Sequence, residues 1–424
     1  MRRMAKDLQP AEQRSGWISS WLPSWCPTSL SQLKDAEDKM LKSVKAPFSR
    51  QHVQISNGNY LWTLAFTSHI KPHPSLPPQP QPKPHPSLPP QPQPKLHPSL
   101  PHQPQPHPSL PPQPQPQPHI SLSPHTQPHP SSPQPSLQPR PPLVLLHGFG
   151  GGVGLWAQNL DSLCGSGAVY ALDLLGFGQS SRPLFSVDPQ GAEEQFLGAL
   201  EEWRDRVGLE EMVLLGHNLG GYLAAAYTLT HPHRVKHLIL VEPWGIPARP
   251  ENLDQEKSIP VWIRAMGAVM SPFNPLAGLR LAGPLGPMLI QTIRSDFKQK
   301  YSSVFDDNTV SDYIYHLNAQ TPSGETAFRN MTVPYGWAKR PMLDRIGQIQ
   351  PDIPISIIYG SRSSIDSDSG YTIQKIRPDV DIIVIRGGGH YVFADQPDDF
   401  NQNVLHILAR MEGDKEKRSE EWCG

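Results

Sequence analysis

The chain has 424 residues and 52 prolines, 30 of which fall between Lys71 and Pro142, so the rest amounts to about one large domain. Lysine and arginine number 37 against 38 for aspartate and glutamate, a formal net charge of -1. A chain with this charge balance has no overall positive potential that would attract nucleic acid, so we expect no nucleic-acid partner. The three cysteines lack paired spacing, which predicts no metal site and a reducing, cytoplasmic compartment.

The N-terminal segment 1–45 predicts contact with a lipid surface without a membrane crossing. Trp17, Trp21 and Trp25 are spaced four apart, and tryptophan favours the boundary between lipid and water. The alternative is that the three rings pack back on the domain as a clasp. No signal peptide is recognisable, and the most apolar long window, 268–290, is interrupted by prolines and Arg280. We therefore expect no transmembrane segment.

Residues 46–70 are expected to open the fold as a β-hairpin. The segment alternates apolar and polar residues around Asn57-Gly58, a strong signal for a tight turn between antiparallel strands. Residues 71–142 then repeat a twelve-residue unit, KPHPSLPPQPQP. Such a segment cannot bury a core and predicts a disordered, polyproline-like insertion, to which no function is assigned.

From Leu143 the sequence predicts a doubly wound, mostly parallel α/β sheet. Short apolar runs alternate with helical segments such as 193–207 and 219–230, a pattern typical of buried parallel strands linked by helices. The runs are LVLLHG, AVYALDL, MVLLGHN, HLILVEP, ISIIYG and DIIVIRG. The core is thus expected at 143–243 and 352–412, with a helical cap at 244–351 over the C-terminal edge of the sheet and a charged tail at 413–424.

The segment 216–220, GHNLG, follows an apolar strand and precedes a helix. This is where α/β-hydrolases place the G-x-S-x-G nucleophile elbow, but Asn218 occupies the serine position. An amide has no proton whose removal yields a useful nucleophile. We therefore expect no acyl-enzyme chemistry, and a loss of turnover on the order of 10⁶ relative to an intact site.

Other parts of a hydrolase site are present. The backbone N–H groups of Phe149 and Leu219 occupy the positions of oxyanion-hole donors, and His390 follows the last strand, as a triad histidine does. Asp366, after the penultimate strand, is favoured as its acid, although Asp368 and Glu242 remain competitors. A purely structural His390 is the alternative.

His390 and Asp395 also spell H-x-x-x-x-D. In glycerolipid acyltransferases the histidine of this signature is a general base towards an acceptor hydroxyl. Because the hydrolase fold already explains His390, coincidence is the favoured interpretation.

Several longer motifs carry a resemblance over almost the whole chain outside the repeats. They are SGWxxxWLPxWCPTS, PLVLLHGFGGGxGLWA, LDLLGFGxSSRP, LGHNLGG, LILVEPWG, TPSGETAFRNMT, PYGWAKRPML and GGGHYVFADQP. Together they closely resemble the abhydrolase domain-containing branch of the α/β-hydrolase superfamily, in particular its lipid-droplet co-activators of triacylglycerol lipase. The asparagine of LGHNLGG separates these from serine-bearing members, whereas the insertion at 71–142 and the charged tail depart from the pattern.

The resemblance implies that Trp17, Trp21 and Trp25 hold the protein on lipid droplets. It further implies that the protein activates a triacylglycerol lipase under the control of perilipin-type coat proteins. A second implied activity is acyl-CoA-dependent acylation of lysophosphatidic acid through His390 and Asp395. A third hypothesis is a lipid sensor in which bound acyl-CoA controls partner contacts. No cofactor is expected, and acyl-CoA enters only as a ligand or substrate.

Overall fold

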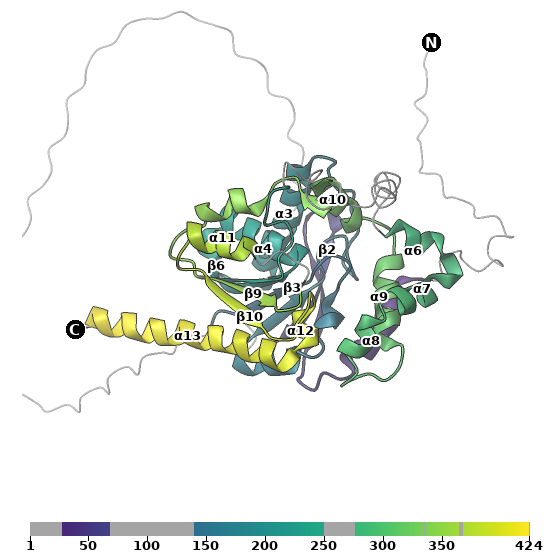
Figure 1. Cartoon of the computed structure of the whole chain (residues 1–424), viewed down its shortest axis with the longest axis horizontal. Helices are drawn as coiled ribbons and strands as arrows, with labels where there is room; N and C mark the ends of the chain where they lie inside the picture. The colour runs from purple at the N-terminus through teal and green to yellow at the C-terminus, as the bar shows by residue number, and fades with distance from the viewer. Residues whose placement is uncertain (1–27, 68–139, 250–275, 334–335, 364–367, 424) are drawn as a thin grey trace, which may run out of the picture. The chain divides into compact units, whose positions relative to one another are not determined.

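The computed structural model describes residues 28–67, 140–249, 276–333, 336–363 and 368–423 (Figure 1). Four features predicted from the sequence lie outside these residues: the three N-terminal tryptophans, nearly all of the proline-rich repeat, residues 250–275 of the expected cap, and Asp366.

An eight-stranded sheet with the order β1-β2-β4-β3-β5-β6-β9-β10 forms the centre of the fold. The strands are β1 Ser49–Gln54, β2 Tyr60–Phe66, β3 Leu143–Leu146, β4 Val169–Leu172, β5 Met212–His217, β6 Val235–Val241, β9 Ile355–Gly360 and β10 Asp381–Ile385. β2 is antiparallel to both β1 and β4, and the remaining pairs are parallel. The predicted doubly wound, mostly parallel sheet is confirmed, and each of the six apolar runs forms a strand.

Helices cover both faces of the sheet because its central strands are apolar on both sides. Along β5, Leu214 packs in one hydrophobic cluster with α3 and α4, whereas Val213 and Leu215 pack in a second cluster with α1 and α13. This alternation is the period of two expected of a strand. The helices are α1 Leu30–Leu41, α2 Leu160–Leu163, α3 Pro189–Val207, α4 Leu219–Thr230, α11 Asp368–Ile376, α12 Val392–Asp395 and α13 Pro397–Cys423.

The segment between β6 and β9 contributes a further group of helices and a small hairpin (Figure 1). They are α6 Ala277–Leu281, α7 Gly286–Ile293, α8 Asp296–Lys300, α9 Thr309–Ala319 and α10 Gly324–Met331, followed by β7 Thr332–Val333 and β8 Trp337–Ala338. Gly154 donates a backbone N–H to the hydroxyl of Tyr313 on α9 (3.0 Å), and Gly324 at the start of α10 donates to the carbonyl of Gly176 (3.1 Å). α9 and α10 therefore lie against the loops that follow β3 and β4.

None of the helices within the described ranges is long and apolar enough to cross a membrane.

Helix α1 packs on the sheet through a buried carboxyl as well as apolar side chains. Ser29 caps its N-terminus by accepting the N–H of Gln32 (3.1 Å). Glu37 is 1% exposed and accepts the indole N–H of Trp62 (2.8 Å). Burial, reinforced by the nearby carboxylate of Asp173, raises the pKa of Glu37 to about 8. Glu37 therefore binds its proton more tightly in the folded chain than in the unfolded one.

The raised pKa makes stability depend on pH in a defined direction. Between about 4.5 and about 8 the folded state keeps the Glu37 proton while the unfolded chain releases it, so the free energy of unfolding falls as pH rises through this window. Glu37→Gln should flatten this fall and be roughly 1–3 kcal/mol more stable than wild type at pH 9. Urea denaturation from pH 5 to 9 measures the free energy of unfolding of both proteins. The control is Glu194→Gln, which removes an exposed carboxylate. Parallel pH profiles for Glu37→Gln and wild type would contradict the assignment.

Candidate functional site

The chain turns from β5 into α4 at a single residue, Asn218, with φ 51° and ψ -113°. Two glycines make this turn sterically feasible. A Cβ on Gly216 would lie 2.2 Å from the carbonyl oxygen of Gly220, and one on Gly220 would lie 2.5 Å from that of Leu146. Strained backbone of this kind, with a non-glycine residue at positive φ, is concentrated at functional sites. The turn has the geometry of a nucleophile elbow.

The side chain at the elbow is bonded to one of the two expected oxyanion-hole donors. Phe149 donates its backbone N–H to Oδ1 of Asn218 (3.2 Å). Leu219, the other expected donor, begins α4 directly after the turn. An amide oxygen thus lies where a substrate oxyanion would be stabilised. Asn218 places no hydroxyl or thiol at the elbow, and its Oδ1 satisfies the Phe149 N–H.

Two buried histidines lie beside the elbow. His147 accepts the N–H of Leu174 at Nε2 (2.9 Å), so its proton is on Nδ1 and is donated to the carbonyl of Gly148 (2.8 Å). Burial lowers the pKa of His147 to about 4. His217 donates Nε2–H to the carbonyl of His390 (2.9 Å), and burial holds the pKa of His217 well below its usual value. Both rings are therefore neutral and structural near pH 7.

The carboxylate that faces His390 within the described residues is Glu242. Nδ1 of His390 lies 3.7 Å from Oε2 of Glu242, which is fully buried and has a positive φ of 46°. Gly360 donates its N–H to Oε1 of the same carboxylate (2.6 Å), and the hydroxyl of Ser363 donates to Oε2. Asp366, the favoured acid, lies outside the described residues, and Asp368 begins α11. Ser363 occupies the loop position where the acid commonly occurs. Its hydroxyl instead donates a hydrogen bond to Glu242, which follows the neighbouring strand β6.

Asp395 does not form a dyad with His390 in the part of the chain that the structure describes. Its Oδ2 accepts the N–H of Gly389 (2.9 Å), and its Oδ1 pairs with the ammonium group of Lys300 on α8. These contacts hold the glycine turn immediately before His390 and join it to α8. In this structure Asp395 supports the loop that carries His390.

Aromatic rings lie above the elbow. The rings of Phe149 and Phe328 stack with centroids 4.4 Å apart, and the ring of Trp244 lies 4.7 Å from Phe328. The backbone N–H of Trp244 also donates to the carbonyl of Asn218 (3.1 Å). α10 and the loop after β6 thus place apolar side chains beside the elbow.

The sequence identified these contacts only in part. Glu242 directly follows a predicted strand and was named as a competitor, but the loop that usually carries the triad acid favoured Asp366. Lys300 lies 95 residues before Asp395, and nothing in the local sequence links the two. In the described part of the chain, no three His, Cys, Asp or Glu side chains come together in a way that could hold a metal ion.

The comparisons agree with this geometry. The family described as the alpha/beta hydrolase fold matches residues 141–397, and the chain belongs to the α/β-hydrolase fold family. Among curated relatives, human 1-acylglycerol-3-phosphate O-acyltransferase ABHD5 is 52% identical over 95% of this chain and 96% of its own. Human (Lyso)-N-acylphosphatidylethanolamine lipase is 43% identical over 95% and 98%.

These relatives confirm the resemblance seen in the sequence. Among solved structures, the carboxylesterase CesB from Bacillus subtilis aligns with TM-score 0.53 and 14% identity, over 89% of this chain and 98% of its own. At that identity the likeness bears on the fold alone.

The elbow glycines can be tested directly. Because its Cβ would collide with the Gly220 carbonyl, Gly216→Ala should lower the free energy of unfolding by about 3 kcal/mol or more, or prevent folding. The matched control is Gly198→Ala on the exposed side of α3, where a Cβ meets nothing within 4 Å. That change should stabilise by about 0.5–1 kcal/mol. Similar denaturation midpoints for the two variants would show that the turn is not as tight as described.

Proposed function

We propose that this chain is an α/β-hydrolase-fold protein without ester-hydrolysing chemistry of its own. It co-activates a triacylglycerol lipase at the surface of cytoplasmic lipid droplets and thereby promotes triacylglycerol breakdown. The observation that carries the proposal is Asn218 at the elbow, with Oδ1 bonded to the Phe149 N–H. A site with neither nucleophile nor a free donor at Phe149 is poorly suited to acyl transfer through a covalent intermediate. The lipase partner and perilipin-type regulators come from the sequence resemblance.

An exposed apolar surface on α6, on α7 and on the turn between them supports contact with a lipid interface. Leu281, Leu285, Met288 and Ile293 are each between 64% and 69% exposed. Large apolar side chains gathered on neighbouring short helices mark a binding surface more often than single exposed ones do. Together with Trp17, Trp21 and Trp25, they would give the protein two contacts with lipid.

Fatty-acid release from emulsified triacylglycerol tests the proposal. The arms are the purified protein alone, a purified triacylglycerol lipase alone, and both together. We expect no release by the protein, a basal rate for the lipase, and a several-fold higher rate for the mixture. Release by the protein alone would reveal an unrecognised nucleophile, and an unchanged lipase rate would reject co-activation.

The same assay, with droplet flotation, tests the lipid contacts. Burying one large apolar side chain stabilises by about 1.5–3 kcal/mol, so changing Leu285, Met288 and Ile293 to Ser should lower droplet binding at least about tenfold. The control changes Leu184 and Val187 to Ser, which are 96% and 85% exposed before α3, and should leave binding intact. Equal losses in the two variants would remove the special role of α7.

Changing Trp17, Trp21 and Trp25 to Ala should likewise release the protein from droplets, whereas unchanged retention would favour the N-terminal clasp.

A second candidate is a lysophosphatidic acid acyltransferase, favoured by the buried Glu242 beside His390 and by the name of the 52% identical relatives. In this reaction His390 would take the proton of the acceptor hydroxyl. The oxygen would attack the acyl-CoA thioester carbon, and the thiolate of CoA would leave and take up the proton.

His390→Gln should then lower transfer from labelled acyl-CoA at least about a hundredfold, within the usual range for a general base. His406→Gln, on the exposed side of α13, is the matched control and should retain the wild-type rate. Transfer that survives His390→Gln would exclude this residue as the base and leave the acyltransferase candidate without its site.

A further inference from the structure

The first described residue of the chain, Thr28, is fixed to the C-terminal end of α9. The hydroxyl of Thr28 accepts the side-chain N–H of Gln320 (2.8 Å) and is hydrogen-bonded to Nδ1 of His316 (3.0 Å). Gln320 also donates to the carbonyl of Ser29 (3.3 Å). The segment 1–27, which carries the three tryptophans, is therefore joined to the domain at this end of α9.

Helices α6 and α7 are held by the same part of α9 (Figure 1). Arg280 on α6 donates its Nε–H to the carbonyl of Gln320 (2.9 Å). Tyr315 on α9 packs in a small hydrophobic cluster with Leu279 of α6, and Leu289 of α7 packs against that cluster. The two helices and the start of the described chain are thus neighbours, because all three contact the C-terminal half of α9.

α6, α7 and the turn between them present an apolar surface, which we call the α6–α7 surface. It consists of the four side chains Leu281, Leu285, Met288 and Ile293, which are between 64% and 69% exposed. None of the residues 281–293 is charged. An exposed apolar cluster of this kind marks a binding surface, and the absence of charge favours an uncharged, apolar occupant.

The end of the N-terminal segment matches this surface in chemistry and in reach. Residues 15–27 include Trp17, Trp21 and Trp25 and carry no charged side chain. A chain extends by at most about 3.6 Å per residue, so Trp25 lies within about 11 Å of Thr28 and Trp21 within about 25 Å. The eight residues of α7 span about 12 Å. The tryptophans can therefore reach the α6–α7 surface of their own chain.

We propose that, in the absence of lipid, residues 15–27 dock on the α6–α7 surface of the same chain. Docking removes apolar area from water on both partners, the indole rings and the four exposed side chains. The covalent connection gives the segment an effective concentration on the order of mM, so a weak contact keeps it docked. A lipid surface that binds α7 must then displace the segment. The clasp and the lipid contact are thus two states of one segment.

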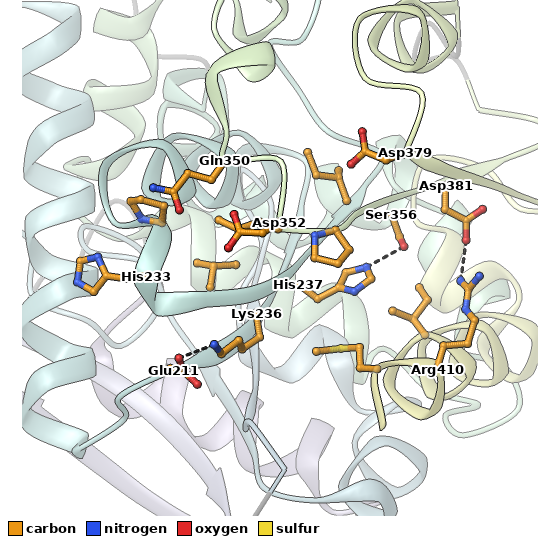
Figure 2. Close-up of a pocket in the computed structure, with 17 residues that line it drawn as sticks. Glu211, His233, Lys236, His237, Gln350, Asp352, Ser356, Asp379, Asp381 and Arg410 are labelled. Carbon is orange, nitrogen blue, oxygen red and sulfur yellow. Dashed lines mark hydrogen bonds and ion pairs between the residues drawn. The ribbon is translucent and has the colours of Figure 1, made fainter. Parts of the chain in front are cut away.

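The cavity shown in Figure 2 is a less suitable site for the tryptophan rings. It has a volume of about 580 Å³ and is lined by the starts of β6, β9 and β10 and by α13. Its lining includes the ion pairs of Lys236 with Glu211 (2.6 Å) and of Arg410 with Asp381 (2.6 Å). An indole ring placed over these charges would remove water from them at a cost. None of the lining residues belongs to α6, α7 or α9.

NMR of methionine methyl groups in the full-length, lipid-free chain tests docking at the surface. The ¹³C-labelled methyl signal of Met288 is assigned by its loss in Met288→Leu. We expect the ring currents of the docked tryptophans to displace this signal from the position of an exposed methionine. Changing Trp17, Trp21 and Trp25 to Ala should return it to that position, whereas an unchanged signal would refute docking.

The control keeps the rings and changes three serines of the same segment, Ser15, Ser19 and Ser24, to Ala. It should leave the Met288 signal where it is in the wild type. Met411 lines the cavity of Figure 2, so a response of its methyl group in place of Met288 would overturn the proposed site. A Met288 displacement that disappears on dilution would assign the contact to a second copy and overturn docking within one chain.

Digestion with chymotrypsin, which cleaves after tryptophan, is the reciprocal test. Docked rings are protected, and the cleavage rate follows the undocked fraction when docking is fast relative to cleavage. Changing Leu285, Met288 and Ile293 to Ser should therefore speed cleavage within residues 15–27 at least about fivefold. Mass spectrometry of the released peptides measures this rate. Equal rates in this variant and the wild type would refute the proposal.

The matched control for digestion changes Leu184 and Val187 to Ser. Both are exposed and lie outside the α6–α7 surface, so cleavage within residues 15–27 should keep the wild-type rate. An equal acceleration in this control would show that the protection does not come from α7 and would overturn the proposal. Both tests are run without lipid, so they are independent of the proposed lipase and acyltransferase functions.

Discussion

The reversal of the chain at Asn218 depends on close backbone approach, and the geometry of the site follows from it. Gly216 and Gly220 cannot be replaced by larger residues, because a Cβ at either position would lie within 2.5 Å of a backbone oxygen. The positive φ of Asn218 costs on the order of 1–3 kcal/mol, which the packing around it must offset. The apolar β5 and the fully buried first turns of α4 supply that packing. The turn can therefore persist whatever chemistry its side chain supports.

Asparagine suits this turn for physical reasons that do not involve catalysis. Asparagine tolerates positive φ better than most residues, and its Oδ1 accepts the N–H of Phe149. Its backbone also accepts from Tyr222 and Trp244, which ties the elbow to α4 and to the loop after β6. Asparagine at this position therefore gives a well-bonded turn.

The sequence predicted the sheet because its strands carry their signal locally, in short apolar runs such as LVLLHG and ISIIYG. It also located Asn218, Phe149 and His390, since each follows a strand at the same edge. It left Glu242, Asp366 and Asp368 open as acids for His390, because two strand ends supply carboxylates; among the described residues Glu242 lies 3.7 Å from the histidine, and the preference for Asp366 stays a prediction. It did not pair Asp395 with Lys300, because that contact depends on how α8 folds back.

The buried Glu242 offers a reason for the presence of His390 that holds with or without turnover. A fully buried carboxylate is strongly destabilising unless it is hydrogen-bonded or paired. Gly360 and Ser363 donate to it, and the His390 ring lies 3.7 Å away. Removing His390 would expose this carboxylate, and removing Lys300 would take away the ion pair of Asp395. A histidine and an acid at the end of a hydrolase sheet can thus be maintained by packing, so their presence does not by itself establish catalysis.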